Sequence, residues 1–174
     1  FELQQGSVTL TLTTTGNGNC LAVNDQITVT ATPAPEVSAG ADITACSSAL
    51  NVPLNGSVSG GATTGQWSSS GTGTFFPNAD LLAATYMASS LDSLNGSVQL
   101  TLTSTGNGLC SAVSDMLTLT ILPNAIANAG VDQTVCASET SIALNGTISG
   151  NATQGLWTTN GSGSFAPNAD AANA

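Results

Sequence analysis

The amino-acid sequence predicts an all-β protein made of tandem Greek-key β-sandwich domains. Three observations lead to this prediction: motifs recur at an offset of 90 residues, apolar and polar side chains alternate in short runs, and turns rich in Gly and Asn separate those runs. Alternation suits a half-buried strand, because every second side chain then faces the core. Seven such runs in each 90 residues fit a Greek-key sandwich.

The repeat appears in motifs of very different chemistry. Cys46 returns as Cys136 and Trp67 as Trp157, in each case 90 residues later. Longer motifs return at the same offset: Gly6-Ser7-Val8 at 96–98, Thr15-Gly16-Asn17-Gly18 at 105–108, Leu54-Asn55-Gly56 at 144–146 and Pro77-Asn78-Ala79-Asp80 at 167–170. Ninety residues is the size of one Ig-like sandwich and is too long for one turn of a solenoid.

Proline-containing stretches at 32–35 and 122–124 mark the domain boundaries, because proline cannot continue a central strand. We therefore expect residues 1–33 to be the C-terminal part of a preceding sandwich, residues 34–123 to be a complete one, and residues 124–174 to be the N-terminal part of a following one. Placed at the 90-residue offset, the two end pieces together make a whole domain except for the phase of residues 85–90. The chain is then either a window of a long array or a protomer whose ends complete one another between chains.

The expected elements of the complete repeat follow in order from the local pattern. Val98, Leu100 and Leu102, for example, alternate with polar residues as in a half-buried strand. A single helical turn is expected before that strand, beginning at Ser89 as its N-cap and ending at Gly96. The strands are expected near 42–46, 49–58, 63–69, 73–76, 82–88, 96–104 and 114–122.

The composition excludes several classes of function. The chain has no Lys, Arg or His and ten acidic residues, giving a formal charge of −10. Without imidazole there is no usual general base, and without a cation nothing holds a phosphate or a nucleic-acid backbone. Serine residues are plentiful, but none has a basic partner that would activate it. We expect a protein that is not an enzyme, has no resident cofactor, binds no nucleic acid and, lacking a run of about 18 apolar residues, does not insert into a membrane.

Each repeat holds two cysteines and one tryptophan. An even cysteine count in a secreted domain predicts a disulfide, here Cys46 with Cys110, leaving Cys20 and Cys136 to pair with neighbouring repeats or chains. A metal site is the alternative, and the absence of a CxxC spacing and of His disfavours it.

Trp67 and Trp157 are expected in the core, with a sugar-stacking platform as the alternative. Tyr86 and Phe76 are the remaining aromatic candidates for a glycan site.

The acidic residues that recur at the 90-residue offset suggest a second kind of site. Carboxylates near a domain junction hold Ca²⁺ in some strings of sandwiches, and the best candidates here are Asp42, Asp80 and Asp115. The competing explanation is turn capping and solubility. The recurrent pairs are Asp42 and Asp132, Asp80 and Asp170, Glu2 and Asp92, and Asp25 and Asp115.

Asn-x-Ser/Thr triplets, which match glycosylation acceptors as well as hairpin turns, begin at Asn55, Asn95, Asn145, Asn151 and Asn160.

The run at 96–110, the domain opening at 129–136, the Leu144-Asn145-Gly146 turn and the Gly-x-Trp strand resemble PKD-like and Ig-like repeats of giant Bacteroidota surface proteins. Those proteins include gliding-motility adhesins and other cargo of the type IX secretion system. The chain departs from ordinary PKD domains after Trp67, where Ser68-Ser69-Ser70 stands in place of the aspartate-rich core motif. The resemblance implies an extracellular or cell-surface location.

The sequence thus leads to a structural hypothesis, in which the repeats form the stalk or filament of a long extracellular adhesin and the partners are neighbouring repeats. Two alternatives stay open. One is a protomer of an extracellular fibre completed by strand exchange between chains. The other is a repeat module that binds surface glycans.

Overall fold

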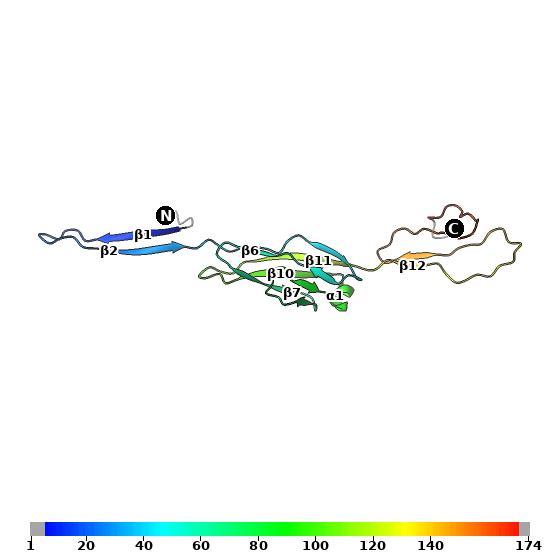
Figure 1. The fold of residues 1–174 in the computed structure, drawn as a ribbon, viewed down its shortest axis with the longest axis horizontal. Coiled ribbons are helices and arrows are strands. Elements are labelled where there is room, and N and C mark those ends of the chain that lie inside the picture. The colour runs from blue at the N-terminus through cyan, green and yellow to red at the C-terminus, as the bar shows by residue number, and fades with distance from the viewer. Residues whose placement is uncertain (1–5, 171–174) are drawn as a thin grey trace.

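The computed structural model describes residues 6–170, which are all-β apart from one short helix (Figure 1). An N-terminal hairpin, a central sandwich and a C-terminal piece follow one another along the long axis (Figure 1). The elements in chain order are β1 (Gly6–Thr13), β2 (Asn24–Ala31), β3 (Glu36–Ser38), β4 (Ile43–Cys46), β5 (Asn51–Pro53), β6 (Ser57–Ser59), β7 (Thr64–Ser69), β8 (Thr74–Phe76), β9 (Thr85–Met87), α1 (Ser90–Asn95), β10 (Ser97–Thr105), β11 (Ser114–Leu122), β12 (Ile126–Asn128) and β13 (Thr147–Ser149).

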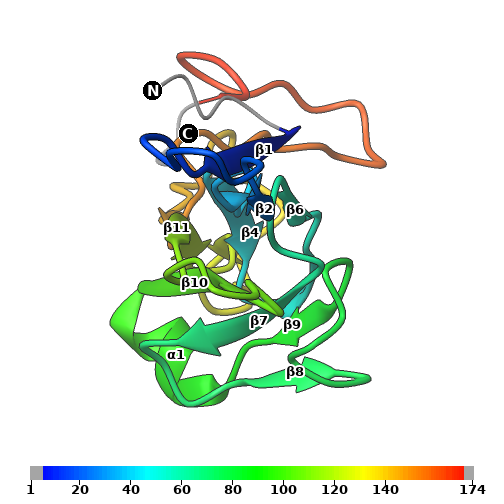
Figure 2. The ribbon, with the colours of Figure 1, turned by 90° about the vertical axis from the view of Figure 1, so that its left-hand side faces the viewer.

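The central sandwich packs a four-stranded sheet, in the order β4-β11-β10-β7, against a three-stranded sheet in the order β5-β9-β8. Figure 2 looks along the long axis and shows β7, β8, β9, β10 and α1 of this sandwich. β10 pairs antiparallel with both β7 and β11, whereas β11 pairs in parallel with β4. Within the described residues, the buried hydrophobic core extends from Ala39 to Ile121 and includes Leu100, Leu102 and Leu119 at 0 % exposure.

The strands expected from the alternation are confirmed, except that one of them divides in two and that the strand expected at 82–88 is shortened to β9. The expected strand at 49–58 divides in two, since Pro53 and the Asn55–Gly56 turn interrupt it. Its first part, β5, stays with β9, and its second part, β6, pairs with β3, a short strand not predicted because prolines stand immediately before it. Ladder-like bonds from Leu54 N to Ala84 O at 2.8 Å and from Gly56 N to Leu82 O at 3.1 Å continue past β5 without a regular strand.

Helix α1 forms where the sequence predicts it. Ser89 is its N-cap, and its side chain accepts a hydrogen bond from Asp92 N while the Asp92 side chain accepts one from Ser89 N, which completes a capping box. Gly96 ends the helix at φ 76°, a left-handed conformation that glycine adopts without penalty.

The structure repeats at the same 90-residue offset as the sequence. β1 and β2 pair in the register of β10 and β11, with Ser7 opposite Thr30 as Ser97 is opposite Thr120. Hairpin β12–β13 likewise matches β3–β6. Cis peptide bonds stand before Pro77 and before Pro167, which are also 90 residues apart. The repetition is partial, because the residues that correspond to β4, β5, β7 and β8 form no strands in the described part of the C-terminal piece.

The chain enters and leaves the sandwich at opposite ends. Near the entrance, Ala39 N donates a 2.8 Å hydrogen bond to the Asp115 carboxylate, at the start of β11. At the exit, the last residue of β11 is Leu122, which lies beside Cys46 of β4. The nine residues of β11, about 26 Å of strand at 3.3 Å per step, separate the two ends.

Candidate functional site: an open groove and its matching hairpin

Leu102 of β10 occupies a closely fitted seat in the complete sandwich. A Cβ added to Gly56 would lie 2.6 Å from Leu102 Cδ2 and 2.7 Å from the Trp67 ring. A Cβ added to Gly65 would lie 3.0 Å from Leu102 Cδ1 and 2.9 Å from Val58. Both glycines are needed because the leucine lies directly against their backbone. Leu102 is 0 % exposed there, and Trp67 2 %.

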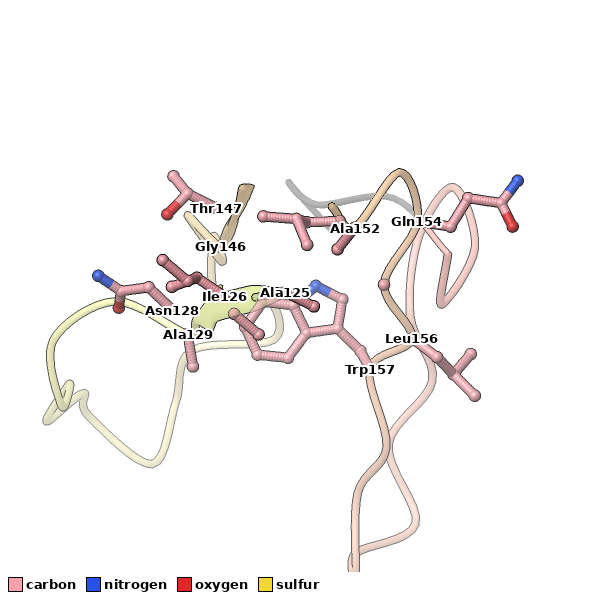
Figure 3. Close-up of a pocket in the computed structure, with 13 residues that line it drawn as sticks. Ala125, Ile126, Asn128, Ala129, Gly146, Thr147, Ala152, Gln154, Leu156 and Trp157 are labelled. Carbon is pink, nitrogen blue, oxygen red and sulfur yellow. The ribbon is translucent and has the colours of Figure 1, made fainter. Parts of the chain in front are cut away.

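The C-terminal piece leaves the equivalent seat open. A pocket of about 420 Å³ is lined there by Gly146, Gly155 and Trp157, which are the counterparts of Gly56, Gly65 and Trp67 at the 90-residue offset. Ile126 and Ile148 line it as well, and Figure 3 shows the Trp157 indole at the centre of the lining side chains. The described part of this piece contains no counterpart of β10 or β11, which in the complete repeat lie between β4 and β7. The groove thus lies in a piece whose described strands are β12 and β13 and which lacks the hairpin that fills the equivalent space in the central sandwich.

The N-terminal hairpin β1–β2 exposes apolar side chains whose counterparts in the central sandwich are buried in the core. Leu12, the counterpart of Leu102, is 79 % exposed, and Ile27, the counterpart of Leu117, is 60 % exposed. Val8, Leu10 and Val29 are 38 %, 39 % and 37 % exposed, although their counterparts in β10 and β11 are all buried. Sequence, register and side-chain chemistry of β1–β2 therefore match the segment that the groove lacks.

The two cysteines of the complete repeat lie too far apart to pair. Cys46 lies opposite Leu122 at the end of β4, whereas the Cys110 thiol donates to the Pro33 carbonyl oxygen at 3.8 Å, before β11 begins at Ser114. About 26 Å of strand separates these positions, and a disulfide needs Cα atoms within about 7 Å. All four thiols are free. The predicted Cys46–Cys110 disulfide within one repeat is therefore wrong, while the pairing of Cys20 and Cys136 with neighbouring repeats stays a prediction.

The three aspartates proposed for calcium do not share a site in this chain. Asp42 accepts from Thr118 N at 2.7 Å and Asp115 from Ala39 N at 2.8 Å, both on the β4–β11 side of the sheet. Asp80 accepts from the Gln66 side chain at 2.8 Å, on strand β7 at the other edge. Within residues 6–170 no three acidic, Cys or His side chains are grouped as metal ligands, which corrects the calcium hypothesis in its single-chain form. Glu2 lies outside the described residues.

The carboxylate that the structure brings into the core is Asp92, which sequence reasoning noted only as a recurrent acid. It is 1 % exposed and accepts four hydrogen bonds, from Thr72 N at 2.8 Å, Gly73 N at 3.0 Å, Ser89 N at 2.9 Å and the Tyr86 hydroxyl at 2.9 Å. Burial opposes its ionisation, but the hydrogen bonds outweigh burial and hold the pKa of Asp92 below its ordinary value. The Ser89-x-x-Asp92 capping-box spacing is the sequence signal that predicts this role.

The aromatic candidates for a glycan site are not grouped on the surface. Tyr86 is 0 % exposed, which makes its proposal as a surface aromatic wrong, and burial raises the pKa of its hydroxyl. Its ring contacts Phe75, which also stacks with Trp67, so these three rings belong to the core. Phe76 is exposed. The five Asn-x-Ser/Thr asparagines are all exposed, and their glycosylation stays a prediction.

Comparisons with known proteins find no matching protein-family profile and no matching curated protein. Among solved structures, a chain of the protocadherin gammaB7 EC3-6 cis-dimer structure is similar over 97 % of this chain, with 13 % sequence identity and a TM-score of 0.43. The chain spans about half, 49 %, of that protein's length. A likeness at this level does not define a function. No helix within residues 6–170 is long and apolar enough to cross a membrane.

Proposed function

We propose that the chain is a structural repeat segment, with no catalytic role, in the stalk or filament of a long extracellular adhesin. The observation that carries this proposal is the position of the two linkers at opposite ends of the complete sandwich. Ala39 contacts Asp115 at one end of β11, and Leu122 leaves from the other. Repeats joined in this way add length rather than bulk.

Composition and resemblance support the same proposal. The absence of Lys and Arg leaves no site for trypsin-like proteases, and the charge of −10 keeps an extended surface soluble. The resemblance to PKD-like repeats of giant Bacteroidota surface proteins supports a place among exported surface proteins, a group that includes gliding-motility adhesins and type IX secretion cargo.

Duplicating residues 34–123 within the full chain tests the spacer function. Each added repeat is expected to lengthen the particle by at least about 26 Å, the length of strand β11 at 3.3 Å per step. Small-angle X-ray scattering at concentrations where the chain is monomeric measures the maximum dimension. A duplicated chain whose maximum dimension stays that of the original would show repeats folded side by side and would contradict the proposal.

A second function is favoured by the groove and hairpin. The β1–β2 hairpin of one copy has the residues to complete the C-terminal piece of another, with Leu12 placed against Gly155 and Trp157 as Leu102 lies against Gly65 and Trp67. Copies joined in this way form a fibre by exchange of strands. In an array longer than these residues, the same groove receives the hairpin of its own repeat.

Assembly of the 174-residue chain is expected to depend on both surfaces. Leu12→Asp replaces the apolar side chain that would enter the groove, and Gly155→Val places a side chain inside the groove. Each variant alone is therefore expected to remain monomeric. The parent chain is expected to form oligomers in steps of 17.1 kDa. Mixed together, the two variants retain one intact groove and one intact hairpin and should form a dimer that cannot extend. Light scattering coupled to size exclusion measures these masses.

Thr11→Asp is the matched control, since it adds the same charge on the neighbouring exposed position of β1. It should assemble like the parent chain. Oligomers of Leu12→Asp that match those of the parent, or a mixture of Leu12→Asp with Gly155→Val that stays monomeric, would remove the support for strand exchange. No glycan-binding role is proposed, because the rings of Trp67 and Tyr86 are buried.

A further inference from the structure

The placement of the cysteines assigns them a role between repeats. Cys110 lies at the linker that enters the complete sandwich, with its thiol 3.8 Å from the Pro33 carbonyl oxygen. Cys46 lies at the linker that leaves it, beside Leu122, and Ser47 N donates to the Leu122 carbonyl at 2.9 Å. The sandwich thus presents one thiol to the preceding repeat and one to the following repeat.

The two linkers are counterparts in sequence and are built alike. A side chain at Gly60 would meet the Ala34 carbonyl of the first linker, and one at Gly150 would meet the Asn124 carbonyl of the second, 90 residues on. The short ladders that follow, β3–β6 and β12–β13, share one register. We therefore use the contacts observed at one linker to describe the corresponding contacts at the other.

Superposition of the linkers by the 90-residue offset places both thiols at one junction. Pro33 corresponds to Pro123, the residue after Leu122. Cys46 thus flanks Leu122 from the repeat before the junction, and the following repeat's counterpart of Cys110 flanks Pro123 from the repeat after it. Cys46 is exposed at this position and accessible to an oxidant.

We propose that Cys46 of each repeat forms a disulfide with the Cys110 counterpart of the following repeat, so that every junction of the array is covalently stapled. This rests on the proposed end-to-end order of the repeats. No such pair is present inside one 174-residue chain, which accounts for four free thiols. Between copies joined through β1–β2, the same rule pairs Cys46 with Cys20 of the second copy, and Cys136 with Cys110 of the second copy.

The chemistry is a two-electron oxidation. Two thiols lose two protons and two electrons as the S–S bond forms, and the electrons reduce the disulfide of a thiol–disulfide oxidoreductase, or of oxidised glutathione, to two thiols. Such acceptors operate in the oxidising compartments through which secreted proteins pass.

The test uses the full chain with residues 34–123 present twice in succession. One variant keeps only Cys46 in the first copy and Cys110 in the second, with every other cysteine replaced by Ser. Incubation with oxidised glutathione is expected to join its two thiols within one chain: the first thiol forms a mixed disulfide with glutathione, and the second displaces the glutathione. The product carries no glutathione adduct by intact mass and stays monomeric on a non-reducing gel. Asp-N digestion and mass spectrometry then identify the linked peptides, since Asp42 and Asp92 open the two cysteine-containing fragments.

Two controls carry the same number of thiols in other positions. One keeps Cys110 in the first copy and Cys46 in the second, and the other keeps both cysteines in one copy. Each is expected to give no linked peptides, and its thiols to stay free or to take up one glutathione each. Cross-linking no greater than in these controls, or cross-links only between chains, would overturn the staple. X-ray scattering of the same chain after reduction reports separately whether the repeats lie end to end, so a failed staple and a failed spacer give different results.

Discussion

Replacing Asp92 by Ala is expected to lower the free energy of unfolding by about 3–5 kcal/mol, because a buried charge partner is removed from several donors at once. The amides of Thr72, Gly73 and Ser89 and the hydroxyl of Tyr86 all lose their acceptor. Helix α1 loses half of its capping box as well. Urea denaturation of the full chain followed by circular dichroism measures the change.

Asp92→Asn keeps the shape and removes the charge, so it isolates the ionised carboxylate. The folded-state pKa of Asp92 is lowered, so the stabilisation from ionisation is fully present above the ordinary aspartate pKa and is lost as pH falls through the lower, folded-state value. The stability difference between the parent chain and Asp92→Asn should therefore be constant near neutrality and shrink in acid. Asp80→Asn, which touches one exposed hydrogen bond to Gln66, is the control. A loss for Asp92→Ala no larger than for Asp80→Asn would contradict the assigned role.

The second large effect is expected for Leu102→Ala, which should cost about 2–5 kcal/mol through lost burial and the cavity left behind. The seat has little means of closing, since Gly56 and Gly65 beneath the leucine have no side chains to move in. Leu12→Ala removes the same atoms from the same register position of β1, where the side chain is 79 % exposed. In the monomer its effect should stay within about 0.5 kcal/mol. Equal effects of the two substitutions on urea denaturation would show that position in the repeat does not matter.

Much of the fold could be predicted because it depends on local pattern. Alternation located the strands, and Ser89 and Gly96 located the helix and both of its ends. The order of strands in the sheets could not be predicted, since pairings such as β4 with β11 join residues more than 70 positions apart and leave no local signal. β3 was missed because it is only three residues long and follows the prolines of the linker, so that its pairing with β6 defines it more than its own sequence does.

The arrangement of the site residues also depends on long-range pairing and could be predicted only in part. Cysteine count predicts a disulfide, but only the direction of β11 shows that Cys46 and Cys110 lie at opposite ends of it. The lining of the open groove has a sequence signal that was available, because Gly146, Gly155 and Trp157 repeat Gly56, Gly65 and Trp67 at the 90-residue offset. Its fit to Leu12 was not predictable from the sequence, because it depends on how Gly56, Gly65 and Trp67 pack around Leu102 in the folded sandwich.

The parallel pairing of β4 with β11 determines how the sandwich responds when its ends are pulled apart. β4 connects through β3 to the N-terminal linker, which lies at the opposite end of the sandwich, whereas β11 runs directly into the C-terminal linker. The two strands are neighbours from Leu119 opposite Ile43 to Leu122 opposite Cys46. Tension through the linkers draws these strands past one another along their length, so their hydrogen bonds, which lie across the strands, are loaded together instead of opening one by one. The sandwich therefore has the geometry of a shear clamp, and in the proposed stalk this geometry would resist tension along the array.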